Sequence, residues 1–292
     1  MSWFVPVPLV LLHPAARIGW RYFTVHPTTV AGIVALLVLY EWRARVHAPR
    51  DPTEKPSAAQ RALFGSGLLL LFLSLNGPLH DLSDYYLFGA HMVQHLVLTL
   101  WVPPLLIAGT PGWMLRPALR VPWVALFARR LTDPRVAFVI FNTVVAAWHL
   151  PPAYNTAMAW HPVHIVQHLM FLVSATLMWW PLASPLPELP RLAYPGQMLY
   201  CFLMSIPMSL VAIYIALADH VLYPAYSAAP RLWGITPLAD QQIGGLIMWV
   251  PGGLFFLLVM SVVFFRWSAV DADHRAGAQV NWKPAQRWGS VE

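Results

Sequence analysis

Residues 86–109 read YLFGAHMVQHLVLTLWVPPLLIAG, a stretch without any Asp, Glu, Lys or Arg. A membrane-spanning helix needs about 20 mostly apolar residues, because the hydrocarbon core offers no partners to exposed backbone groups. The same character recurs elsewhere in the chain. The sequence predicts seven transmembrane helices, at residues 28–42, 63–79, 86–109, 136–150, 164–182, 198–218 and 243–267. We therefore expect an all-α, polytopic membrane protein.

The composition of the whole chain agrees with this expectation and excludes other classes. Of its 292 residues, 58% are hydrophobic and only 10% are charged, whereas soluble domains carry about 25% charged residues. This balance excludes a soluble globular enzyme and a disordered chain. The single cysteine, Cys201, excludes an internal disulfide and a CxxC site for metal or redox chemistry.

The basic residues predict the orientation of the helices. Of the 18 Lys and Arg residues, 15 follow the first, third, fifth and last predicted helices. Basic loops stay in the cytoplasm, so the N-terminus is expected outside and the C-terminus in the cytoplasm. Because this charge is spread over loops, the net charge of +6 indicates a lipid bilayer and not a nucleic acid as partner. We expect an N-terminal interfacial segment (1–27), one membrane domain (28–267) and a cytoplasmic tail (268–292).

Histidines gather at the predicted outer ends of the helices. Eight of the 12 histidines lie there or in the outer loops. Residues 91–96 (HMVQHL) and residues 164–169 (HIVQHL) share the pattern HxVQHL, and each follows a helix that ends in His and a short outer loop with Pro. We interpret them as an internal repeat of a helix pair. A third copy, aligned with gaps, would place Asp240 and Gln241 at the position of the motif.

The spacing of these histidines predicts a metal site. Residues i and i+4 lie on one face of a helix, so two imidazoles can bind one ion. Neutral imidazole suits copper, zinc, iron or nickel. The predicted ligands are His91, His95, His149, His164 and His168. Secondary candidates lie beside the motifs or at the outer face: His80, Asp81, Met92, Asp219, His220, Asp240 and Gln241.

Other polar and sulfur-bearing residues have two open interpretations. Methionine is a soft ligand that favours Cu(I). Methionines near the predicted site or in the last two spans are Met92, Met158, Met204, Met208 and Met248, but most methionines are expected to pack. Met92 points about 100° round the helix from His91, so it is not expected to join that residue as a ligand from the same face. The outer carboxylates either orient imidazoles or are solvated. Gln94 and Gln167 lie off the face of the histidines, so we expect interhelical hydrogen bonds from them.

Four motifs together resemble the seven-span CtaG family, which assists assembly of caa-type cytochrome c oxidase. They are residues 90–96 (AHMVQHL) running on to 103–111, residues 148–151 (WHLP), residues 164–182 ending in WWPL, and residues 240–252 (DQQIGGLIMWVPG). The resemblance covers about residues 60–267, and neither the first helix nor the tail carries a matching motif. The single-span, cysteine-ligated copper protein that shares the CtaG name is a different protein, because this chain has no cysteine pair.

The resemblance implies a protein of the bacterial plasma membrane that binds copper, as Cu(I) or Cu(II), at the outer face during oxidase maturation. The implied partners are cytochrome c oxidase subunits and a periplasmic or other extracytoplasmic copper donor, and the implied role is not enzymatic. Two alternatives stay open from the residues. One is a zinc-dependent intramembrane hydrolase with Asp240 or Asp219 as general base. The other is a haem-binding membrane cytochrome with axial histidines from two helices.

Overall fold

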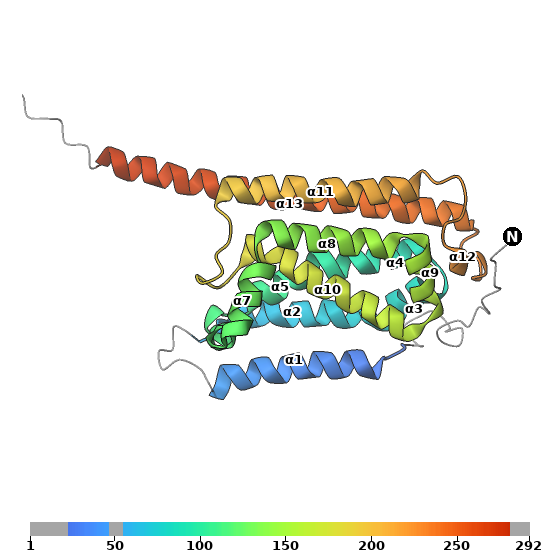
Figure 1. The fold of residues 1–292 in the computed structure, drawn as a ribbon, viewed down its shortest axis with the longest axis horizontal. Helices are drawn as coiled ribbons and strands as arrows, with labels where there is room; N and C mark the ends of the chain where they lie inside the picture. The colour runs from blue at the N-terminus through green and yellow to red at the C-terminus, as the bar shows by residue number, and fades with distance from the viewer. Residues whose placement is uncertain (1–22, 47–54, 281–292) are drawn as a thin grey trace, which may run out of the picture.

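The computed structural model describes residues 23–46 and 55–280, and the regular structure in these ranges is helical. The long helices are α1 (Pro27–Val46), α2 (Ala58–Leu75), α8 (Pro134–His149), α10 (His161–Ala183), α11 (Tyr194–Ala216) and α13 (Pro237–Val280). The shorter ones are α3 (Gly77–Tyr85), α4 (Phe88–Leu96), α5 (Val102–Gly109), α6 (Gly112–Leu115), α7 (Pro122–Leu131), α9 (Pro151–Ala159) and α12 (Pro224–Ser227). The long helices form a bundle along one axis (Figure 1). The predicted all-α class is confirmed for these residues.

Five helical segments are long and apolar enough to cross a membrane: α2, residues 88–109, α10, α11 and residues 237–272 of α13. A sixth span results if α8 and α9, which meet at a bend of 72°, count as one. Helix α1 carries Glu41, Arg43 and Arg45 in its last turns and falls outside this set. The chain is a polytopic membrane protein by these helices, whereas the count of seven and the orientation stay predictions.

Residues 88–109 form one span although they contain two helices. Pro103 and Pro104 have no N–H groups, so they cannot bond to the carbonyls one turn earlier. The backbone widens into a π-helical turn, Val97–Trp101, and Val102 N–H bonds to Val97 O. This turn joins α4 to α5, so His91 and His95 lie on the same span as the apolar residues of α5.

Some predicted boundaries were wrong. Helix α2 ends at Leu75 and not at residue 79, because Gly77 adopts a φ of +68° that turns the chain into α3. His80 therefore lies on its own short helix. The Pro-containing outer loops contain helices α3 and α9, since Pro is well tolerated in a first turn. Helix α13 continues past residue 267 to Val280. The predicted interfacial segment lies mostly outside the described residues, as do residues 281–292.

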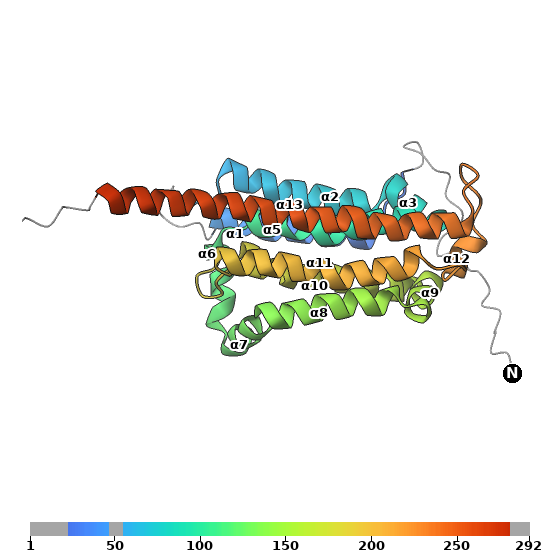
Figure 2. The ribbon, with the colours of Figure 1, turned by 90° about the horizontal axis from the view of Figure 1, so that it is seen from above.

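The packing gathers the short helices at the two ends of the bundle. Helices α3, α9 and α12 lie at one end, and α7 lies at the other (Figures 1 and 2). Helices α11 and α13 pack side by side. The largest buried cluster includes Phe88, Tyr154, Phe171, Tyr223 and Phe256, and joins α4, α9, α10 and α13. Phe88 of this core begins the helix that carries His91, and Tyr154 lies beside His91.

Candidate metal centre

The two copies of HxVQHL face each other across α4 and α10. Within each helix the imidazoles lie one turn apart, with ring centroids 4.2 Å apart for His91 and His95 and 4.3 Å apart for His164 and His168. Between the helices, His91 lies 5.5 Å from His164 and His95 lies 5.6 Å from His168. Four imidazoles from two separate spans therefore lie close together.

One group of donors is made of imidazole alone. Ring nitrogens of His91, His95 and His168 lie within 4.8 Å of one another. Within the described residues, Nε2 of His91, both nitrogens of His95 and Nε2 of His168 have no hydrogen-bond partner. Zinc binds His nitrogen at about 2.0–2.1 Å, so nitrogens around one such ion lie about 4 Å apart or less. Small side-chain rotations would bring these three nitrogens to that distance.

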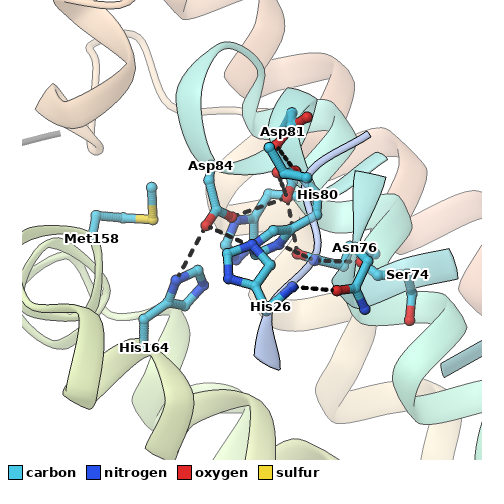
Figure 3. A network of polar contacts seen from close by, with 12 residues as sticks. His26, Ser74, Asn76, His80, Asp81, Asp84, Met158 and His164 are labelled. Carbon is cyan, nitrogen blue, oxygen red and sulfur yellow. Dashed lines mark hydrogen bonds and ion pairs between the residues drawn. The ribbon is translucent and has the colours of Figure 1, made fainter. Parts of the chain in front are cut away.

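A second donor group adds a carboxylate. Asp84, His91 and His164 offer donor atoms within 4.8 Å of one another. Asp84 Oδ2 lies 3.4 Å from His80 Nε2 and 3.5 Å from His164 Nδ1, as Figure 3 shows. Burial raises the pKa of Asp84, but the adjacent imidazoles, His80 first, outweigh this effect and hold the pKa below its ordinary value. Asp84 therefore places a carboxylate between His80 and His164, beside the group of imidazoles.

Asp84 is not among the predicted ligands, although it is one of the outer carboxylates expected either to orient an imidazole or to be solvated. A signal was present, since His80 and Asp84 are four residues apart on one helix. The signal was lost because residues 80–85 were predicted as an outer loop, where carboxylates are usually solvated. In the structure they form α3, which turns Asp84 inward.

Tyr226 on α12 fixes the imidazole of His91. Its hydroxyl donates to Ser83 O at 2.8 Å and lies 3.2 Å from His91 Nδ1. The hydroxyl of Tyr154 lies 2.8 Å away. Because the proton of Tyr226 goes to Ser83 O, His91 must donate from Nδ1, which leaves the Nε2 lone pair for a metal ion.

These tyrosines end two short repeats in the sequence, Pro-Ala-Tyr at residues 152–154 and at residues 224–226. The repeat by itself predicts no role for either tyrosine. Only the fold reveals that the two hydroxyls meet beside His91.

His149 lies on the inner side of this group, at the end of α8. Its Nδ1 donates to Val145 O at 2.7 Å, so the lone pair lies on Nε2. Its ring is 5.6 Å from that of His95. All five predicted histidines are thus brought together, and whether they bind a metal stays a prediction.

A row of further imidazoles continues from this group through His80 to His26 and His161. The ring of His80 lies 6.4 Å from His164 and 4.5 Å from His26, and His26 lies 6.2 Å from His161. Gln94 Nε2 lies 3.0 Å from His80 Nδ1 and donates to Ser74 O at 2.7 Å. The predicted interhelical hydrogen bonding is confirmed for Gln94. Gln167 is fully buried and forms no hydrogen bond within the described residues, so the same prediction was wrong there.

The remaining secondary candidates lie outside the two donor groups. Asp81 accepts a hydrogen bond from Thr24 at 2.6 Å and braces the chain before α1. Asp219 and His220 pair with each other at 2.7 Å, with 95% and 73% of their side chains exposed. Both therefore lie at the surface, outside the two donor groups.

Asp240 and Gln241 position other elements. The two carboxylate oxygens of Asp240 accept hydrogen bonds from the N–H groups of Phe88 at 2.7 Å and Gly89 at 3.0 Å. These groups begin the helix that carries His91 and His95, where a negative charge is favourable. Gln241 accepts from Leu222 N–H at 2.7 Å and fixes the loop before α12. Met92 is buried in the core behind His91 and His95.

Comparisons with known proteins agree with this architecture. The family described as cytochrome c oxidase caa3 assembly factor matches residues 36–269. Uncharacterized proteins from Mycobacterium bovis and Mycobacterium tuberculosis are each 26% identical over 204 residues, and one from Mycobacterium leprae is 22% identical over 209 residues. These matches cover 63–66% of this chain but only 30–31% of the relatives, so the chain spans about a third of their length. No solved structure matches the chain.

The family match runs from α1 into α13 and includes both HxVQHL copies, WHLP and the motif that begins α13. The resemblance inferred from the four motifs is thereby confirmed. The chain belongs to the cytochrome c oxidase caa3 assembly factor family.

Proposed function

We propose that this protein binds copper as a cargo through its histidine cluster and passes it to a cytochrome c oxidase subunit during assembly in the bacterial plasma membrane. The observation that carries the proposal is the meeting of ring nitrogens from His91, His95 and His168, on two spans, within 4.8 Å. Buried nitrogens without partners cost about 1–3 kcal/mol each, so they are retained where they serve a ligand.

The donor set fits a cargo ion better than a fixed structural ion. Imidazole binds copper in both common oxidation states, and several imidazoles lie within reach of each position. An ion could change ligands one at a time along the row that ends at His26 and His161. The assembly-factor family suggests a role without catalysis, in agreement with this proposal.

The first test is metal analysis of the full chain extracted in mild detergent. We expect bound copper in the wild type and its loss in the double variant His91→Ala, His95→Ala, since both residues supply nitrogens without protein partners. His220→Ala is the matched control, because this exposed imidazole is paired with Asp219 away from the cluster. Cells that carry the double variant should also assemble less active oxidase than cells with the control.

The outcomes separate the competing functions. Equal copper in the double variant and the wild type would overturn the proposal. Zinc together with cleavage of a peptide or lipid would favour a hydrolase, for which Asp84, His91 and His164 supply a fitting donor set. A haem spectrum in the purified protein would favour a membrane cytochrome.

A further inference from the structure

A small cavity adjoins the donor group of His91, His95 and His168 and lies among α4, α8, α10, α11 and α13. Its volume is about 20 Å³, enough for one water molecule or one metal ion. The wall is mostly apolar, with Phe141 and Phe171 among its residues. The lining residues that carry nitrogen or sulfur donors are two histidines and three methionines, namely His95, His149, Met92, Met208 and Met248.

The two imidazoles are buried without protein partners for the nitrogens in question. Both nitrogens of His95 and Nε2 of His149 form no hydrogen bond within the described residues. The residues are 5% and 3% exposed, so bulk water does not reach them. His149 already donates from Nδ1 to Val145 O, so its Nε2 is a lone-pair donor and needs a cation or an N–H or O–H group.

The three methionines come from three different helices and are almost fully buried. Gly244, Met248 and Gly252 are spaced four residues apart and share one face of α13. A Cβ at Gly244 would collide with the Phe88 ring and lie 3.2 Å from Met92 Cγ, and a Cβ at Gly252 would collide with Met208 Cε. The glycines thus leave room for Met92 and Met208 on either side of Met248.

We propose that this cavity is a second metal site that is selective for Cu(I). Thioether sulfur is a soft donor that binds Cu(I) in preference to Zn²⁺ or Cu(II), and the neighbouring imidazoles complete the set. The inference rests on the proposed function, since both sites would hold the same cargo. His95 belongs to the donor group of His91, His95 and His168 and also lines the cavity. An ion could therefore move between the two sites by exchanging ligands around His95.

The test is X-ray absorption at the copper and zinc edges on the full chain in detergent, loaded without oxygen with Cu(I) or with Zn²⁺. We expect sulfur and nitrogen neighbours for Cu(I), and nitrogen or oxygen neighbours alone for Zn²⁺. In the double variant Met208→Leu, Met248→Leu most of the sulfur signal should disappear. Its Cu(I) affinity should fall by more than about tenfold. Loss of a residue that only supports a ligand typically costs about 10–100-fold in affinity, and these methionines would be ligands themselves. Zn²⁺ binding at the donor group of His91, His95 and His168 should persist, and this binding also shows that the variant folds correctly.

Met178→Leu is the matched control. Met178 is fully buried like the cavity methionines but does not line the cavity, and leucine nearly conserves its volume. This variant should leave the copper neighbours and the Cu(I) affinity unchanged.

Cu(I) bound with nitrogen neighbours alone in the wild type, or an unchanged sulfur signal in the double variant, would overturn the second site and leave the proposed function intact. A wild-type protein that binds neither ion would overturn the proposed function together with this inference.

Discussion

The two HxVQHL copies differ at one position of six, yet they lie in different surroundings. In the copy on α4 both histidines are buried, and Val93 is the one exposed residue, at 37%. In the copy on α10, His168 is half-buried, and Ile165, Val166 and Leu169 are 43–56% exposed. The motif sets which side chains share a helix face, whereas the position of the helix decides what that face meets. The copy on α4 is central, whereas Ile165, His168 and Leu169 of the copy on α10 line an open pocket that they share with α1.

The largest expected difference between the copies is in metal binding. His91 belongs to both donor groups and is oriented by Tyr226, whereas His168 belongs to one group. His91→Ala should lower metal affinity by about 100-fold or more, and His168→Ala by about tenfold, on the scale of site perturbations in metalloproteins. A metal titration of both variants measures the ratio. A larger loss from His168→Ala than from His91→Ala would show that the copy on α10 contributes more to metal affinity than the copy on α4.

Gln94→Leu should cause the next largest effect. The amide nitrogen of Gln94 forms hydrogen bonds with Ser74 O and His80 Nδ1, and Ser83 Oγ lies 3.1 Å from the amide oxygen. Removing the amide leaves buried polar groups without partners, at a cost of about 1–3 kcal/mol. The thermal unfolding midpoint in detergent should therefore fall. An unchanged midpoint would mean that water replaces the amide.

The equivalent change on α10, Gln167→Leu, should have the smallest effect and the opposite sign. Gln167 is fully buried and forms no hydrogen bond within the described part of the chain. Leucine removes this unpaired amide, so the unfolding midpoint should stay level or rise slightly. A clear fall would reveal a partner of Gln167 and would remove the contrast with Gln94.

Much of the fold could be predicted because long apolar runs have few solutions in a bilayer. Residues 86–109 and 164–182 were predicted as spans and lie in helices that are long and apolar enough to cross. The short outer helices were missed, since α3 and α9 have nine residues each and their Pro residues were interpreted as loop signals. Local sequence distinguishes a short helix poorly from a loop, because packing supplies most of the stability of such a helix.

Apolar length and a spacing of four residues are local properties, so the helical class, the family and the pairing of histidines on single helix faces follow from the amino-acid sequence alone. The packing of the whole chain sets which side chains from different helices meet. It turned Asp84 and Tyr226 toward His91, directed Asp240 to the start of α4, and left Asp219 and His220 at the surface. Contacts between distant segments depend on the bend at Gly77 and on the packing of α4, α10 and α13, and no local pattern encodes these.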